Sequence, residues 1–159
     1  MIKIKSKIDL VLSKLLIIIM AVMVINVLWQ VFTRFVIQSP SSFTDELSRY
    51  LLIWVGLLGA SYATGQKLHL SIDLLPTKFN YKVQKYLHIL INLSVASFAF
   101  FIMIIGGLNL VYITYSLNQY SAALEVSLAL IYMVLPLSGL LIVFYSIINL
   151  YDKPSFGTF

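Results

Sequence analysis

The sequence predicts an all-α integral membrane protein with four transmembrane helices. Of its 159 residues, 60% are hydrophobic and only 11% are charged, whereas a soluble domain carries about 25% charged residues. So few polar groups cannot cover a soluble surface, and lipid must be the solvent for most of the chain. Four segments reach or approach the ~20 apolar residues that a spanning helix needs. They cover about residues 10–36, 44–65, 83–117 and 126–151 of a single membrane domain, 1–159.

Charge and cysteine content exclude several classes. The chain has no Cys, which rules out disulfides, thiolate metal sites and a Cys nucleophile. Its net charge of +5 comes from basic residues spread between apolar spans, where they set membrane orientation, so we expect no nucleic-acid partner. Lysines before an apolar run resemble a signal peptide, but the uncharged run 15–33 exceeds the roughly 7–15 residues of a signal core. We expect it to remain as the first span.

Polar residues at the first two spans predict contacts between helices. The amides of Asn26 and Gln30 suit packing against another helix. Ser42, with Asp45 three residues later, resembles a capping box. Asp45 and Glu46 fall in the first turn of the second span, where a helix N-terminus favours negative charge. Arg49 can pair with either carboxylate, since the spacings are four and three residues.

Small residues follow along one face of the second span. Gly56 and Ala60, and likewise Gly59 and Ala63, lie four residues apart. This spacing lets another helix approach closely inside a membrane. The approaching helix could belong to this chain or to a second subunit, and the sequence leaves both open.

The connection after the second span carries His69 and Asp73, four residues apart. Either they form an ion or proton site at the cytoplasmic edge, or they fix the loop or contact a partner. An amphipathic lead-in to the third span then begins near residue 77. Its basic stripe, which we expect to lie along anionic lipid head groups, consists of Lys78, Lys82 and Lys85.

The last two spans are predicted to be irregular. Residues 86–124 carry no charge, and a helix over 83–117 would be ~50 Å long, well beyond the ~30 Å hydrocarbon layer. It must tilt, project from the membrane, or bend, for instance near Gly106-Gly107. In the fourth span, Pro136 predicts a kink.

Orientation follows from the distribution of Lys and Arg. With four spans, every lysine falls on one side, and only Arg34 and Arg49 fall on the other. We therefore expect both termini in the cytoplasm. The outer face would then hold Asp45, Glu46 and Glu125.

The chemistry of catalysis and transport is missing from this sequence. Ion pumping needs an ionisable group deep in the bilayer, and the predicted span interiors have none. His69 and Asp73 supply two ligands where a metalloenzyme needs three, and no nucleophile or phosphate-binding motif occurs. We predict a protein that is not an enzyme, holds no metal or cofactor, and does not transport alone.

Several motifs resemble the small membrane (permease) subunit of tripartite ATP-independent periplasmic (TRAP) transporters. They are the segment Asp45-Glu46-Leu47-Ser48-Arg49-Tyr50, the run with Trp54, Gly56 and Gly59, the stretch His69-Leu70-Ser71-Ile72-Asp73-Leu74-Leu75, and the set Tyr132, Pro136, Ser138 and Gly139. The likeness covers essentially the whole chain. One departure is Gln66-Lys67, where the family often has two basic residues.

The resemblance implies a non-catalytic subunit in the bacterial inner membrane. In such systems a periplasmic binding protein captures an organic acid, such as a sialic acid or a dicarboxylate, and a large membrane subunit imports it with sodium. The small subunit would flank the large one, and sodium coupling would belong to that partner. The resemblance places a docking rim for the binding protein at Arg34, Asp45, Glu46, Arg49 and Glu125.

Two alternatives stay open beside this interpretation. The chain could be a structural anchor of another membrane complex. Ranked last is a membrane enzyme that uses His69 and Asp73.

Overall fold

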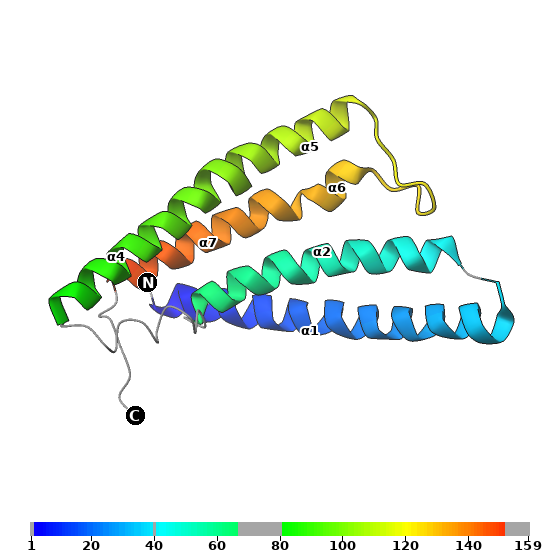
Figure 1. Ribbon diagram of the computed structural model, residues 1–159, viewed down its shortest axis with the longest axis horizontal. Helices are drawn as coiled ribbons and strands as arrows, with labels where there is room; N and C mark the ends of the chain where they lie inside the picture. Colours follow the sequence, from blue (N-terminus) through cyan, green and yellow to red (C-terminus); the bar gives the residue numbers. More distant parts are fainter. Residues whose placement is uncertain (1, 40, 67–80, 152–159) are drawn as a thin grey trace.

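In the residues that the structure describes, the fold is a set of four antiparallel helical runs (Figure 1). The computed structural model describes residues 2–39, 41–66 and 81–151. In chain order its elements, with η for a π-helical segment, are α1 (Ile2–Phe32), η1 (Thr33–Ile37), α2 (Ser42–Gly65), α4 (Tyr81–Phe98), η3 (Ala99–Gly106), α5 (Gly107–Ser116), α6 (Leu128–Tyr132) and α7 (Val134–Tyr151).

The runs lie side by side in a row. α1 contacts α2, α2 contacts α7, and α7 contacts α4 and η3. We call the end where η1 precedes α2 and α5 precedes α6 the connection end (Figure 1). The other end, where α1 begins and where α2 and α7 end, is called the base. Every helical run therefore passes from one of these ends to the other.

The boundaries of the first two runs differ in detail from the sequence prediction. α1 already begins at Ile2, well before the predicted residue 10, because residues 2–9 contain no Gly or Pro to stop a helix. It continues through η1 to Gln38, whose left-handed backbone (φ 56°) ends the run. The predicted capping box is wrong. Ser41 occupies the N-cap without a side-chain hydrogen bond to the helix.

The long third run is helical from α4 through η3 to α5, as predicted. Its irregularity is a π-helical segment that ends at Gly106, beside the predicted bend. Close packing between this run and α7 requires glycine at two positions, one on each side of the contact. A Cβ on Gly107 would lie 3.0 Å from Cδ of Pro136, and a Cβ on Gly139 would lie 2.9 Å from Cβ of Met103. These two contacts let the third and fourth runs pack tightly.

Pro136 interrupts the fourth run, which confirms the predicted irregularity. The run is divided into α6, which ends at Tyr132, and α7, which begins at Val134. Pro136 has no N–H to donate to the carbonyl of Tyr132, four residues earlier, and its ring collides with that carbonyl. The break therefore falls where proline chemistry requires it.

Buried apolar side chains join the row, while most of the large hydrophobic side chains stay exposed. One cluster unites α1, α2 and α7 through Leu12, Ile19, Leu58, Val134 and Tyr145. A second joins η3 to α7 through Ala99, Met103 and Ile142. Side chains such as Ile17 and Leu28 are 67% and 65% exposed, which a protein tolerates when lipid or a partner covers them.

Three stretches of the described chain are long and apolar enough to cross a membrane, judged by length and composition. They are Lys5–Ile37, Tyr86–Ser116 and Leu128–Leu150. The predicted class, an all-α membrane protein, is thus confirmed, and the chain is a multi-pass one. α2 has 24 residues but is not among the three stretches, because charged and polar residues lower its hydropathy.

Candidate functional site

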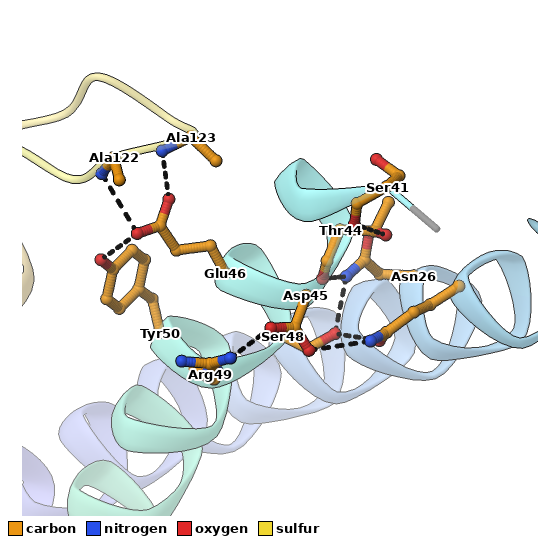
Figure 2. A network of polar contacts seen from close by, with 11 residues as sticks. Asn26, Ser41, Thr44, Asp45, Glu46, Ser48, Arg49, Tyr50, Ala122 and Ala123 are labelled. Atoms are coloured by element: carbon orange, nitrogen blue, oxygen red, sulfur yellow. Dashed lines mark hydrogen bonds and ion pairs between the residues drawn. The ribbon is translucent and has the colours of Figure 1, made fainter. Parts of the chain in front are cut away.

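Glu46 is the centre of a polar network at the connection end (Figure 2). Its Oε2 accepts hydrogen bonds from the backbone N–H of Ala123 at 2.7 Å and of Leu124 at 3.1 Å. Its Oε1 accepts one from the N–H of Ala122 at 3.3 Å and one from the Tyr50 hydroxyl at 3.0 Å. Consecutive backbone N–H groups that converge in this way form an anion-binding nest. We call this arrangement the Glu46 clamp.

The clamp ties α2 to the connection between α5 and α6, residues 117–127. That connection has its own internal order. Ser121 N–H donates to Val126 O at 2.9 Å, and Leu128 N–H donates to Gln119 O at 3.0 Å. Asn118 and Glu125 turn the chain with left-handed backbones, φ 48° and 53°. A carboxylate from another helix thus fastens a compact, internally bonded connection.

Hydrogen bonding also sets the charge state of Glu46, which lies near the start of α2 at the connection end. The pKa of its carboxyl is lowered from 4.5 to about 2, chiefly by the Ser121 hydroxyl and then by the N–H of Ala123, with burial acting in the opposite direction. Donors that bond the ionised form favour it. Glu46 is therefore ionised throughout the neutral range.

Asp45 and its neighbours join α2 to α1 instead. Gln30 Nε2 donates to Asp45 Oδ1 at 2.9 Å. Asn26 Nδ2 donates to Thr44 O at 2.8 Å and to Ser48 Oγ at 2.7 Å. The prediction that the two amides of the first span pack against another helix is confirmed. The two adjacent carboxylates of α2 therefore serve different neighbours, α1 for Asp45 and the 117–127 connection for Glu46.

The predicted rim residues all lie at the connection end, but the structure uses them differently. Arg49 forms an ion pair with Asp45, as the spacing predicted, and its side chain remains 72% exposed. Arg34 in η1 and Glu125 are likewise exposed. Glu46 is instead occupied by the clamp. Of the predicted rim, Arg34, Arg49 and Glu125 thus offer the most accessible charges.

The predicted small-residue face of α2 points away from the rest of the chain. Within the described residues, nothing lies within 4 Å of a Cβ placed on Gly56 or Gly59, and Ala60 is exposed. The opposite face is the packed one. Leu58 is buried there, and Ser61 Oγ donates to Ser138 O on α7 at 3.2 Å. No described helix of this chain therefore uses the face that the sequence predicted for close packing.

A second polar cluster, which the sequence did not predict, lies at the base. The hydroxyl of buried Tyr145 donates to Asp9 Oδ1 at 2.5 Å, and Gln66 Nε2 donates to Asp9 Oδ2 at 3.3 Å. Gly65 makes this possible, because a Cβ there would lie 2.7 Å from the Tyr145 ring. The sequence contains one signal for this cluster, namely Asp9, a single acidic residue among the lysines that precede an apolar run.

The remaining predicted sites are the pair of His69 and Asp73 and the basic stripe of Lys78, Lys82 and Lys85. His69, Asp73 and Lys78 lie outside the described residues, whereas Lys82 and Lys85 belong to the first two turns of α4. In the part of the chain that the structure describes, no three His, Asp or Glu residues gather as a metal site would require.

Comparison with known proteins gives the family. The chain is 42% identical over 60 residues to a putative TRAP transporter small permease protein of Haemophilus influenzae, covering 38% of this chain and 37% of that protein. It is 28% identical over 113 residues to the sialic acid TRAP transporter small permease protein SiaQ of Vibrio cholerae, covering 62% and 65%. A third relative, the sialic acid TRAP transporter permease protein SiaT of H. influenzae, is 33% identical over 66 residues, which cover 42% of this chain and 11% of that protein.

These alignments span less than two thirds of each relative's length. The family assignment has a broader basis. The family model for the DctQ component of the tripartite ATP-independent periplasmic transporters matches residues 12–153, a range that begins within α1 and includes every later helix. The chain therefore belongs to the DctQ component family of the tripartite ATP-independent periplasmic transporters, a family of transporter components and not of enzymes.

Proposed function

We propose that this protein is the small, non-catalytic membrane subunit of a sodium-coupled TRAP transporter for organic acids in a bacterial inner membrane. In this role it flanks the large transport subunit and helps a periplasmic binding protein to dock. The carboxylates in the described residues support a passive role, because Asp9, Asp45, Glu46 and Glu125 belong to the two ends of the molecule. Sodium coupling is accordingly assigned to the large subunit.

The proposed topology has four crossings with both termini in the cytoplasm. α2 supports a fourth crossing because its 24 residues extend ~36 Å at 1.5 Å per residue. It also runs antiparallel to α1 over most of their length (Figure 1). The lysines of the described residues then fall on the base side and the two arginines on the connection side, as the positive-inside rule requires for a cytoplasmic base. The connection end faces the periplasm.

The single observation that carries the proposal is the open small-residue face of α2. Without water, helices associate in membranes by close packing of small residues, and this face has no partner in the described chain. Arg49 continues the same face toward the connection end, since it lies seven residues before Gly56, or about two helical turns. A helix of the large subunit would cover the face, and the exposed Arg49 would lie where that interface reaches the periplasm.

The binding protein would dock at the connection end. Exposed charges there, on Arg34, Arg49 and Glu125, are suited to steering a soluble partner, and the Glu46 clamp holds the 117–127 connection in one conformation. As substrate we propose an organic acid of the sialic acid type, in line with the names of two of the relatives.

Co-purification tests this function directly. Gly56→Leu and Ala60→Phe should abolish recovery of the large subunit with a tagged copy of this chain in mild detergent, since both fill the open face. Ala21→Phe, at an exposed position of α1, is the matched control and should leave recovery unchanged. Normal recovery with both α2 variants would refute the proposed interface.

A further inference from the structure

An apolar groove runs between α1, α2 and α7 in the half of the molecule next to the base. Its volume is about 460 Å³, and its walls include Val11 and Leu15 of α1, Trp54 and Leu58 of α2, and Leu141 of α7. This volume lies within the roughly 300–1,000 Å³ of small-molecule sites. The walls present almost no polar surface, so the groove would accept a hydrocarbon chain.

One charged group borders the groove. Lys7, in the second turn of α1, is exposed and lines it at the base end. The nearest acid in the sequence, Asp9, would repel an anion, but it follows Lys7 by two residues and so projects from a different side of the helix, about 200° away. Its two oxygens already accept hydrogen bonds from Tyr145 and Gln66. The mouth of the groove is therefore cationic.

These features favour a lipid chain over a protein helix as the occupant. A helix with its side chains is about 10–12 Å across and needs a broad face such as the one that Gly56 and Ala60 provide. Trp54 and Leu58 precede these two residues by two positions, and thus lie about 200° around α2 from them. The groove wall and the small-residue face therefore lie on opposite sides of α2, and only the small-residue face is broad enough for a helix.

We propose that this groove binds one anionic phospholipid of the surrounding membrane, such as phosphatidylglycerol. One acyl chain lies along Val11, Leu15 and Trp54, and the phosphate pairs with Lys7. Since bulk lipid is as apolar as the groove, contact with the walls favours a chain only through packing. Preference for an anionic head group comes from the lysine, which near a membrane surface contributes about fivefold in affinity.

Native mass spectrometry of the full-length chain in mild detergent tests the proposal without reference to uptake. The chain is titrated with phosphatidylglycerol and, separately, with zwitterionic phosphatidylcholine. We expect one phosphatidylglycerol to be retained per chain and to bind more tightly than phosphatidylcholine. Lys7→Gln should remove that preference, weakening phosphatidylglycerol about fivefold, whereas Lys14→Gln, on the same helix but outside the groove, should not.

A second pair of variants tests the groove itself. Val11 is 64% exposed and Val24 is 49% exposed, so both accept a larger side chain without disturbing the fold. Val11→Trp fills the groove and should abolish retention of the lipid, while Val24→Trp should preserve it. Equal binding of the two lipids by the unmodified chain, or retention in Val11→Trp, would overturn the proposal. So would cross-linking of Val11→Cys to another polypeptide in membranes, because a protein would then occupy the groove.

Discussion

The carboxylate of Glu46 on α2 accepts a hydrogen bond from the backbone N–H of Ala123, 77 positions later, at 2.7 Å. Together with the hydrogen bonds from the N–H groups of Ala122 and Leu124, this contact joins the α1–α2 pair to the 117–127 connection at the connection end. A single side chain thereby orders a whole connection. Its removal has consequences that can be measured at the backbone groups it binds.

Glu46→Ala should release the connection while the helices remain folded. The N–H of Ala123 loses its acceptor, and the N–H of Leu124 keeps only Ser121 Oγ, at 3.4 Å. Hydrogen exchange of these amides should accelerate about tenfold, as expected for the loss of a charged acceptor. Asp45→Asn is the control, because Asp45 bonds Gln30 and Arg49 instead. Unchanged exchange in Glu46→Ala would show that the clamp does not hold the connection.

The clamp should also respond to acid in a defined range. The pKa of Glu46 is about 2 when clamped and 4.5 in its ordinary state. A carboxyl with a lowered folded pKa stabilises fully above its ordinary pKa and loses that contribution as pH falls toward the folded value. Protection of the Ala123 and Leu124 amides, corrected for intrinsic exchange, should therefore be constant from pH 7.5 to 5 and fall below 4.5. Loss of protection already near pH 6 would contradict this assignment.

Two glycines that look alike in sequence should respond oppositely to alanine. A Cβ at Gly139 would lie 2.9 Å from Met103 Cβ and 3.2 Å from Ala99 O, whereas one at Gly56 meets nothing within 4 Å in the described chain. Gly139→Ala should destabilise by about 1–3 kcal/mol through overpacking. Gly56→Ala should be neutral or stabilise by up to ~1 kcal/mol, since alanine favours helix. Thermal unfolding in detergent measures both, and equal effects would contradict the packing described for α7.

Much of the fold can be predicted from the sequence. The features that could not be predicted depend on contacts that the sequence does not reveal. Apolar runs predict the helices, and Pro136 predicts the break in the fourth run, because both signals are local. Glu46 could be placed at a helix start, but most of its partners are backbone N–H groups, which carry no residue-specific signal. Tyr145 likewise does not stand out among apolar neighbours until folding brings it to Asp9. The sequence of η3 contains no residue before Gly106 that would predict a π-helical segment.

Arg49 allows the docking role to be separated from the ion pair within this chain. Arg49→Glu should lower substrate uptake by the reconstituted three-component system without reducing recovery of the large subunit. The swap of Asp45→Arg with Arg49→Asp restores an ion pair but reverses each charge. If Arg49 serves docking, uptake should stay low in the swap. Recovery of uptake would instead assign Arg49 to local structure, and normal uptake in Arg49→Glu would remove the docking role.

The bond between Asp9 and Tyr145 should be the main polar link between α1 and α7 at the base. The two residues are 136 positions apart, so the bond links helices from the beginning and the end of the sequence. Tyr145→Phe and Asp9→Ala should each destabilise the protein by about 1–2 kcal/mol, because the remaining partner loses a hydrogen bond in a partly buried site. The double variant should cost clearly less than the sum, since residues in direct contact are not additive. Chemical or thermal unfolding of the four proteins gives this cycle, and strict additivity would show that the two side chains act independently.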